Sequence, residues 1–274
     1  MKQATLAVTG TNGAQGGAIA QALTRHGHEV RPIRRQVIES GGATLQDELR
    51  GAQALIITSP IDHRAGARES QFANLTKAAR AVGVSRLVLN TAAVVHERFD
   101  RPVSKVLLHL REMVMNSGVD AVSVEPTVYL DNLIAPWSVS AIVQGGVLAY
   151  PAPEDAPIAW ISHSSLAGYV LAALEQFSSG SIHKVAGPHA ITGLQLAKIL
   201  GDFVGREVGY ERMPLEAFAQ SLDAAVGAPA GQDIGDYYRY LVEHPDALSA
   251  TNCATLHSVQ SESAQEWAAR QKWR

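Results

Sequence analysis

A glycine-rich stretch near the N-terminus, Gly10-Thr11-Asn12-Gly13-Ala14-Gln15-Gly16-Gly17, constrains the fold of this chain more than any other feature. It follows a short apolar segment, 4–9, that is typical of a buried parallel strand, and it opens a segment, 16–26, with apolar residues at helical spacing. In this context the three spaced glycines permit a tight turn, a close approach of backbone to a pyrophosphate, and close packing of helix on strand. The stretch predicts a dinucleotide-binding loop, and a plain strand-to-helix turn is the alternative.

Strand and helix signals alternate along the first half of the chain. The predicted strands are 29–33, 54–58, 86–89 and 121–124, and the predicted helices are 69–82 and 103–116. Strands separated by helices of this length form βαβ units, which build a parallel sheet covered by helices on both faces. The sequence therefore predicts an α/β, doubly wound parallel-sheet Rossmann fold. Between the second and third strands we predict one more short strand, Val37 to Glu39, ended by Gly41-Gly42.

The alternation is lost in the second half of the chain. The 274 residues correspond to about 1.8 domains at about 150 residues each. We expect a dinucleotide-binding Rossmann domain at 1–130 and a smaller, mostly helical C-terminal substrate lobe at 131–274. Within the lobe we predict helices at 166–177 and 193–204, the latter with Thr192 as N-cap, and a strand near 182–186 that returns to the Rossmann sheet.

Composition and charge exclude several classes of protein. The net charge of −3 and the absence of a basic cluster argue against a nucleic-acid partner. The uncharged stretch 132–153 is broken by prolines and a glycine pair, so we interpret it as buried helix, turn and strand, with no membrane partner. A single cysteine, Cys253, allows neither an internal disulfide nor a thiolate zinc site, and the histidine spacing predicts no metal site. With no apolar signal core near Met1, we expect a cytoplasmic protein.

The residues after the second predicted strand indicate which cofactor is bound. An acidic residue there is typical of NAD binding, because it accepts hydrogen bonds from the ribose hydroxyls. This chain instead has Arg34-Arg35, with Arg31 nearby and no acid before Glu39. A guanidinium binds the 2′-phosphate of NADP through charge-assisted contacts, whereas a carboxylate repels it. We therefore predict NADP(H) as cofactor; the alternative is that these arginines are solvated surface charges.

The sequence resembles the NmrA-like family, a branch of the atypical short-chain dehydrogenase/reductases. The similar segments are the glycine-rich loop, Ile57-Thr58-Ser59-Pro60, and the segments 78–88, 117–120, 126–132 and 186–188. The resemblance implies a Rossmann fold, a small C-terminal substrate lobe and a cleft between them, with Thr58, Ser59 and Pro60 at the cofactor. Some members of this branch are NADPH-dependent reductases of quinones, dyes or phenylpropanoids, and others are redox-sensing regulators.

The chain also departs from the pattern of the wider superfamily. None of its seven tyrosines is followed by a lysine four positions later, so the Tyr-x-x-x-Lys pair is absent. Glu125 stands where the branch commonly has arginine, and Ser165 stands where it has aspartate. The lysine that the resemblance leads us to expect in the helix before Ser117-Gly118 is displaced, and the nearest one is Lys105.

Four polar residues near predicted strand ends are candidates for contact with the reacting groups. Thr91 follows a strand and is a candidate for contact with the nicotinamide, or it is an ordinary strand-end residue. Tyr129 follows the next strand, and its phenol is a candidate proton donor. His96 and Lys105 flank a loop near the same strand ends and are candidates to stabilise an oxyanion. The alternative for these last three is a structural tyrosine and solvated surface groups.

Aromatic residues in the lobe are candidates for substrate binding. Trp137, Tyr150 and Trp160, with Asn132 from the resembling motif, form a candidate flat apolar pocket for an aromatic substrate; core packing is the alternative. The tyrosines at 237, 238 and 240 are interpreted as a pocket wall or an oligomer contact, and a homodimer is one expected assembly. No Gly-x-Ser-x-Gly motif occurs, which argues against an esterase.

Three functions agree with these features. The first is an NADPH-dependent reductase that transfers hydride to a small, aromatic or conjugated carbonyl or quinone-type acceptor without a Tyr-x-x-x-Lys pair. The second is a non-catalytic NADP(H)-sensing regulatory protein, which the absent pair favours. The third is a redox-neutral biosynthetic enzyme on the same fold. A quinone needs little acid help, so the missing pair does not exclude the first.

Overall fold

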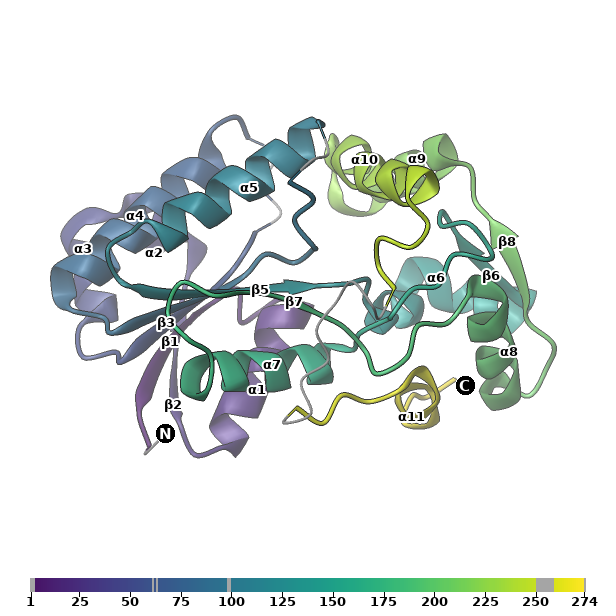
Figure 1. Ribbon diagram of the computed structural model, residues 1–274, viewed down its shortest axis with the longest axis horizontal. Coiled ribbons are helices and arrows are strands. Elements are labelled where there is room, and N and C mark those ends of the chain that lie inside the picture. The colour runs from purple at the N-terminus through teal and green to yellow at the C-terminus, as the bar shows by residue number, and fades with distance from the viewer. Residues whose placement is uncertain (1–2, 61, 63, 98–99, 250–258, 274) are drawn as a thin grey trace.

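A computed structural model describes residues 3–60, 62, 64–97, 100–249 and 259–273. Two parts lie side by side, a layered part that contains the main sheet and a smaller part built largely from the second half of the chain (Figure 1). Cys253 lies outside the described residues, as does the side chain of Trp137.

A six-stranded parallel sheet organises the larger part. The strands in spatial order are β2 (Glu29–Ile33), β1 (Thr5–Thr9), β3 (Ala54–Thr58), β4 (Arg86–Asn90), β5 (Asp120–Pro126) and β7 (Ile182–Val185). Because β1 pairs with β2 on one side and β3 on the other, the direction of winding reverses at β1. Crevices outside the carboxyl ends of strands at such a reversal are where open α/β sheets bind ligands.

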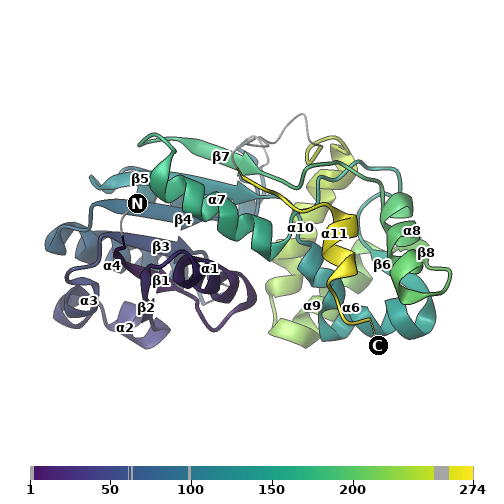
Figure 2. The same ribbon diagram turned by 90° about the horizontal axis from the view of Figure 1, so that it is seen from below.

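Helices cover both faces of this sheet, which is seen nearly edge-on in Figure 1, and Figure 2 looks onto one of the two covered faces. On one face lie α1 (Ala14–Arg25) and α7 (His163–Glu175), and on the other lie α3 (Gly42–Leu49), α4 (Ala67–Val82) and α5 (Pro102–Met115). Side chains alternate along each strand, so Leu6 and Val8 of β1 pack against the first pair while Ala7 packs toward the other face. The predicted α/β, doubly wound parallel-sheet fold is confirmed.

The predicted strand at 37–39 is wrong, because Arg35–Ser40 forms the short helix α2. Helical geometry buries Val37 and Ile38 against the core beside α3 and α4, and this packing outweighs the strand preference of adjacent β-branched residues. Gly41 lies between α2 and α3, and Gly42 is the first residue of α3; their φ values are +59° and +54°. Asn74 of α4 donates to the Ile38 carbonyl oxygen at 2.9 Å, which satisfies the end of α2.

The smaller part contains a second, two-stranded parallel sheet surrounded by helices. Its strands are β6 (Val147–Tyr150) and β8 (Gly209–Arg212), and its helices are α6 (Pro136–Ser140), α8 (Gly193–Val204), α9 (Leu215–Val226), α10 (Ala230–Glu243) and α11 (Ala264–Ala269). Thr192 caps α8 as predicted, since its hydroxyl accepts from the Gln195 N–H at 3.2 Å. We call this part the lobe.

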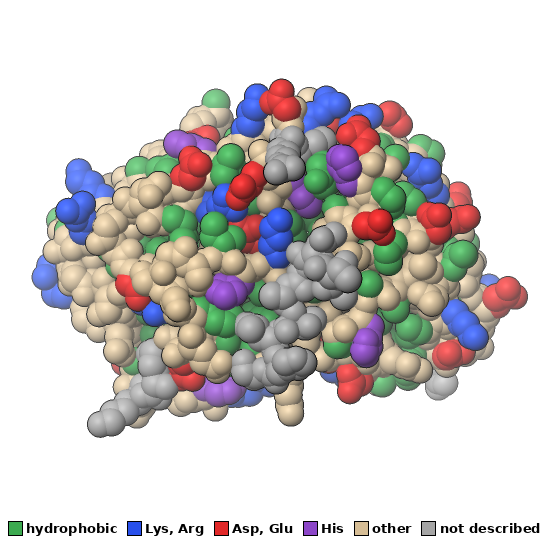
Figure 3. Space-filling model, viewed as in Figure 1, with side chains coloured by type: hydrophobic (Ala, Val, Ile, Leu, Met, Phe, Trp, Pro, Cys, Tyr) green, Lys and Arg blue, Asp and Glu red, His purple; other side chains and the backbone are tan. Residues whose placement is uncertain are grey.

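The uncharged stretch at 132–153 follows the predicted succession of helix, turn and strand. It contains the end of a 3₁₀ helix (Leu130–Ile134), α6, a π-helical turn (Ala141–Gly145) and β6. Among the described residues, no helix has both the length and the apolar character needed to cross a lipid bilayer. On the face seen in Figure 3, acidic and basic side chains are interspersed, in keeping with the small net charge.

Candidate functional site

The glycine-rich stretch forms the tight turn between β1 and α1. Gly10 has a φ of +69°, in the left-handed region where a side chain causes strain. A Cβ atom on Gly16 would lie 2.2 Å from the Gly10 carbonyl oxygen, so α1 starts closer to the strand than a residue with a side chain allows. On Gly13 it would lie 3.3 Å from the same oxygen, a tight but tolerable distance. The turn therefore depends on glycine at 10 and 16.

The N-terminus of α1 has donors to offer to a ligand. Its N-cap, Gly13, makes no side-chain hydrogen bond, and the first turn contains no acidic residue. The first N–H groups of a helix have no partner within the helix and lie at the positive end of its dipole. Ala14, the first residue of the helix, is exposed, whereas the Gly13 N–H already donates to the Gly10 carbonyl oxygen at 2.9 Å. This arrangement suits a phosphate or pyrophosphate.

A cavity of about 830 Å³ extends from this turn into the lobe. It lies at the carboxyl ends of β1 and β3, where the sheet reverses its winding. The predicted cofactor-binding residues that line it are Gly10, Thr11, Asn12, Gly13, Ala14, Gln15, Gly16, Arg34, Arg35, Thr58, Ser59 and Pro60. The lobe contributes Asn132, Ser138, Ala141, Ile142, Leu148, Ala149, Tyr150, Met213, Phe218, Ser221, Leu222, Ile234 and Tyr238. The cavity therefore has a sheet wall and a lobe wall.

Two threonines join the ends of β1 and β3 at the sheet wall. The Thr58 N–H donates to the Thr9 hydroxyl oxygen at 2.9 Å. The Thr58 hydroxyl is itself buried and has no hydrogen-bond partner among the described residues. A buried polar group without a partner costs about 1–3 kcal/mol, and a ligand that bonds to it recovers that cost. Together with the open helix N-terminus, this hydroxyl fits a polar, phosphate-bearing ligand such as a dinucleotide.

The arginines after β2 occupy different positions. Arg34 is the N-cap of α2 and Arg35 its first residue, and both line the cavity. The exposed Arg34 side chain lies 3.9 Å from Glu48, a separation at which a surface ion pair contributes little. Arg31 instead donates to the carbonyl oxygens of Glu48 and Arg50 at 2.9 and 2.8 Å. Arg34 and Arg35 are thus the pair placed to meet an anion in the cavity.

Among the described residues, Glu39, the first acidic residue after β2, is paired with Arg64 and not with Arg34 or Arg35. Glu39 forms an ion pair with Arg64, which also donates to Asp62 at 2.7 Å. Gln71 of α4 donates to the same Asp62 carboxylate at 2.9 Å. The Arg64 guanidinium holds the pKa of Asp62 well below its usual range, so this carboxylate stays charged. The network compensates the charge of Glu39 beside the arginine-lined end of the cavity.

Gln15 in the turn is held by two side chains from the sheet. Its Oε1 atom accepts from Asn90 Nδ2 at 2.8 Å and from the Tyr129 hydroxyl at 3.1 Å. Asn90 Oδ1 in turn accepts from the N–H of Ala92, whose φ is +65°. Burial raises the pKa of Tyr129 well above its usual value, so the phenol stays protonated. With its oxygen engaged, Gln15 leaves its amide nitrogen as the donor for a ligand, and Tyr129 acts here as a support for the turn.

Three other candidates do not line the cavity. Thr91 is buried, and its hydroxyl donates to the Ala93 carbonyl oxygen at 2.6 Å. Lys105 lies on α5 with an exposed side chain and pairs with Asp100 at 2.6 Å. His96 is buried between the two parts. The structure thus brings together the predicted cofactor residues apart from Thr91, and leaves His96 and Lys105 outside the group.

His96 packs its ring on α10. Its ring centroid lies 4.0 Å from that of Tyr240 and 5.5 Å from that of Tyr237. Burial, together with the charges of Lys184 and His244, lowers the pKa of His96 to about 3. The imidazole is therefore neutral at physiological pH, and it lies where the β4–α5 connection meets the lobe.

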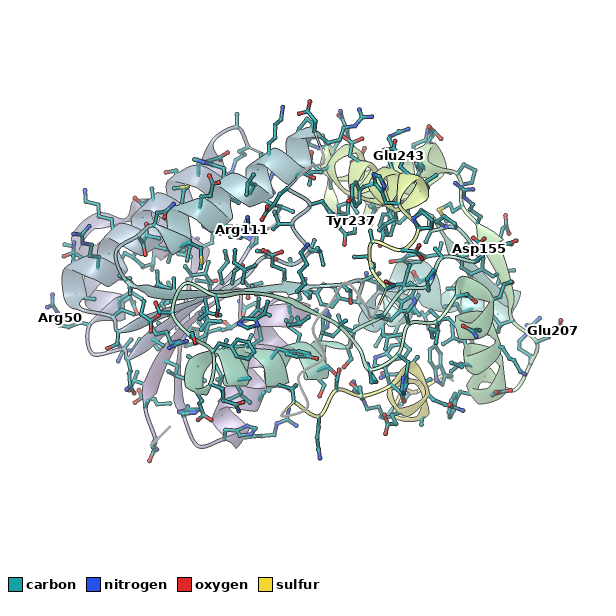
Figure 4. The ribbon with its side chains drawn as sticks, in the orientation of Figure 1. Arg50, Arg111, Asp155, Glu207, Tyr237 and Glu243 are labelled. Atoms are coloured by element: carbon teal, nitrogen blue, oxygen red, sulfur yellow. The ribbon has the colours of Figure 1, made fainter. Side chains whose placement is uncertain are left out.

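A buried ion pair supports the same connection. Glu125 of β5 is fully buried; its carboxylate accepts from the Val95 N–H at 3.0 Å and from Arg111 at 2.9 Å. Arg111, which lies between α5 and the sheet in Figure 4, also donates to Glu97 at 2.6 Å. A carboxylate at 125, where the resemblance leads us to expect arginine, is thus matched by an arginine on α5. Together they hold residues 95–97 over the strand ends.

Aromatic side chains form much of the lobe wall. Tyr150 and Tyr238 line the cavity, and Trp160 packs its ring edge-on to Tyr150 with centroids 5.0 Å apart. Trp160 is buried behind Tyr150 and does not itself line the cavity. Asn132 lines it, whereas the Trp137 side chain is outside the described residues. The predicted substrate residues Asn132 and Tyr150 thus lie opposite the glycine-rich turn in the same cavity.

The sequence analysis did not identify His163, the first residue of α7, which also lines the cavity. Its N–H donates to Asp131 at 2.8 Å, and its ring centroid lies 4.8 Å from that of Tyr129. Burial lowers the pKa of His163, while the adjacent Asp131 opposes this shift. Phe218, Leu222 and Ile234 of the lobe wall were missed as well, because their helices show no signal beyond ordinary amphipathic spacing.

The family model for the NmrA-like family matches residues 2–267. The chain belongs to the NmrA-like family. The predicted resemblance is therefore confirmed over nearly the whole chain.

Known proteins similar to this NmrA-like chain include several reductases. It is 28% identical over 246 residues to a (4-alkanoyl-5-oxo-2,5-dihydrofuran-3-yl)methyl phosphate reductase of Streptomyces griseus, covering 82% of this chain and 83% of the relative. It is 28% identical over 218 residues to quinone oxidoreductase 2 of Escherichia coli, covering 78% and 71%. The crystal structure of an E. coli NADPH-dependent quinone oxidoreductase complexed with NADPH superposes with a TM-score of 0.70 at 22% identity, over 96% of this chain and 98% of that one.

Proposed function

We propose that this protein is an NADP(H)-dependent reductase of a small carbonyl or quinone-type acceptor. The observation that carries the proposal is the continuity of the cavity, which joins a phosphate-binding turn to an apolar, aromatic wall. A bound nicotinamide supplies the electron pair and hydrogen for the reduction. The chain's own residues bind, orient and exclude water around the two reactants. The reductases among the relatives support the same kind of activity.

Each end of the cavity has a role in this proposal. The turn at 10–16 and the Thr58 hydroxyl bind the pyrophosphate and nearby polar groups, and Arg34 and Arg35 bind the 2′-phosphate. The apolar side chains of the lobe wall, among them Leu148, Phe218 and Ile234, cover the acceptor. The proposal places no reacting role on Tyr129, His96 or Lys105, since none of them lines the cavity.

The first experiment measures NADPH oxidation with panels of quinones, enones and aldehydes. We expect oxidation that depends on the acceptor, and its absence across all panels would contradict the proposal. Binding of NADP(H) without any turnover would instead favour the nucleotide-sensing alternative. Subunit assembly, including the expected homodimer, is measured in the same samples by light scattering.

A second experiment tests the cofactor. We expect NADPH to bind more tightly than NADH, and Arg35→Ala to weaken NADPH binding about tenfold to a hundredfold while leaving NADH binding nearly unchanged, because a charge-assisted contact contributes about 1.5–3 kcal/mol. Calorimetric titration measures both constants. Arg50→Ala is the matched control, since this exposed arginine pairs with Asp47 and does not line the cavity. Equal affinity of the wild type for the two cofactors would refute the assignment.

A further inference from the structure

Two tyrosines far apart in sequence meet in the lobe wall. Tyr150 ends β6 and Tyr238 lies on α10, and their hydroxyl oxygens are 2.5 Å apart. Both residues are buried, with 6% and 4% of their surface exposed, and both line the cavity. The fold has therefore placed a pair of phenols where an acceptor would lie.

The Tyr150–Tyr238 pair has one phenol proton that their shared hydrogen bond does not use. Two phenols joined by one hydrogen bond use one of their two protons for it. Burial raises the pKa of Tyr150 to about 12, and its hydrogen bonds with Tyr238 and Asn132 act in the opposite direction. Either hydroxyl can donate in the shared bond, so one phenol proton of the pair is left over in both cases. Burial raises the pKa of Tyr238 well above its usual value, so its phenol stays protonated as well. With Tyr238 as the donor, the remaining proton is that of Tyr150, and no other hydrogen bond among the described residues uses it.

The aromatic surroundings of the pair strengthen a hydrogen bond from a phenol to a ligand oxygen. Phe218 lies edge-on to Tyr238 with centroids 5.0 Å apart, and Trp160 lies at the same distance from Tyr150. Rings on these sides keep water away from the hydroxyl groups. In such a low-dielectric setting, a positioned donor stabilises negative charge on a ligand oxygen more than it does in water.

We propose that Tyr150 is the hydrogen-bond and proton donor to the oxygen of a carbonyl-bearing acceptor, with Tyr238 and Asn132 as positioning residues. This inference rests on the proposed reductase function and narrows its substrates to quinones, enones and other carbonyl compounds. It also supplies the acid that the absent Tyr-x-x-x-Lys pair would provide, from a different element of the fold.

The acceptor carbon gains a C–H bond, whose hydrogen and electron pair come from the reduced nicotinamide, and NADPH becomes NADP⁺. The π electron pair of the acceptor moves onto its oxygen, which forms an O–H bond with the proton of Tyr150. The phenolate left on Tyr150 is held by hydrogen bonds from Tyr238 and Asn132 until solvent returns the proton. The acceptor is thereby reduced by two electrons.

A binding experiment without turnover tests the donor directly. The probe is 4-nitrophenol, whose phenolate is coloured, titrated against the protein saturated with NADP⁺. We expect Tyr150→Phe to weaken nitrophenolate binding about tenfold to a hundredfold and Tyr238→Phe to weaken it severalfold, because hydrogen bonds to a charged oxygen are strong. The control is Tyr210→Phe, whose hydroxyl donates to the Ala152 carbonyl oxygen at 2.6 Å and which does not line the cavity. Equal binding by wild type, Tyr150→Phe and Tyr238→Phe would overturn the assignment.

Turnover then separates this inference from the proposed function. With the best acceptor of the panel, we expect Tyr150→Phe to lower kcat about tenfold to a hundredfold with little change in the KM for NADPH. If the wild type reduces carbonyl acceptors and Tyr150→Phe keeps the full kcat, Tyr150 is not the donor and the reductase proposal stands. If no acceptor is reduced but nitrophenolate binding depends on Tyr150, the donor site stands and the reductase proposal fails. Tyr238→Phe, which keeps Tyr150 in place, gives the same test should Tyr150→Phe not fold.

Discussion

The sheet wall and the lobe wall of the cavity are built in different ways. Much of the sheet wall is one contiguous turn, 10–16, whose donors are backbone N–H groups and whose shape depends on glycine. The lobe wall brings together Tyr150, Phe218 and Tyr238 from β6, α9 and α10, and it works through side chains. The comparison indicates that the sheet wall serves a ligand common to many Rossmann proteins, whereas the lobe wall determines which acceptor fits.

The largest expected effect concerns the buried ion pair between β5 and α5. We expect Arg111→Met to lower the free energy of unfolding by about 3–5 kcal/mol, because it leaves the buried Glu125 carboxylate unpaired. Urea unfolding measures the change. Lys105→Met is the control on the same helix, where an exposed pair with Asp100 contributes at most about 1 kcal/mol. Similar losses for the two variants would show that the connection after β4 is not held by this pair.

The second prediction tests whether glycine geometry dictates the sheet wall. We expect Gly16→Ala to weaken NADPH binding by about a hundredfold, since overpacking of this kind costs up to about 3 kcal/mol. Gly13→Ala, with its Cβ at 3.3 Å from the Gly10 oxygen, is the graded comparison and should cost several times less in affinity. Fluorescence titration measures both constants. Equal effects would mean that the turn relaxes and that its geometry is less restrictive than the distances indicate.

The third prediction concerns pH and the contact between the two parts. The pKa of His96 is lowered to about 3, so below about pH 6.5 the unfolded chain binds a proton that the folded chain does not. The contribution of His96 to the free energy of unfolding is therefore complete above about pH 6.5. It falls as the pH drops toward 3, by at most about 1.4 kcal/mol per pH unit. We expect His96→Phe to flatten the dependence in urea unfolding between pH 4 and pH 7. An unchanged slope, equal to that of a variant at the exposed His189, would contradict this account.

The smallest expected effect contrasts two buried tyrosines, Tyr129, which supports the glycine-rich turn, and Tyr150, which lies in the lobe wall. The Tyr129 hydroxyl donates a hydrogen bond to Gln15, so Tyr129→Phe should weaken NADPH binding about twofold to tenfold, through the loss of one neutral hydrogen bond of about 0.5–1.5 kcal/mol. The KM for the acceptor should stay unchanged. Tyr150→Phe should instead leave NADPH binding unchanged and change the kinetics with the acceptor. The same pattern in both variants would remove the distinction between a wall for the cofactor and a wall for the acceptor.

Local signals were enough to predict most of the sheet. The strands at 29–33 and 54–58 match the structure residue for residue. The second is a buried apolar run between clear breaks, which is typical of a central parallel strand. The helix at 35–40 was mistaken for a strand, because its packing against α3 and α4 is not visible in adjacent residues. The pairing of β6 with β8 was missed for a related reason, since it joins segments about 60 residues apart.

In the candidate site, too, local position predicted some residues and failed for others. The cofactor residues at 10–16, 34–35 and 58–60 follow β1, β2 and β3, and residues at the carboxyl ends of neighbouring parallel strands meet at one edge of the sheet. Tyr129, His96 and Lys105 follow strand ends as well, yet they turn toward Gln15, α10 and Asp100. Position along a strand predicts proximity to the site, but it does not predict which way a side chain points.

The sequence by itself determined the family, the Rossmann sheet and the phosphate-binding turn, since these depend on local spacing and on where glycine is required. Only the tertiary structure decided which polar groups remain free to meet a ligand. Gln15 accepts hydrogen bonds from Tyr129 and Asn90, while Tyr150 and Tyr238 share one hydrogen bond that leaves one phenol proton of the pair unused. The physical reason is that a side chain's chemistry depends on the hydrogen bonds and burial provided by neighbours distant in the chain.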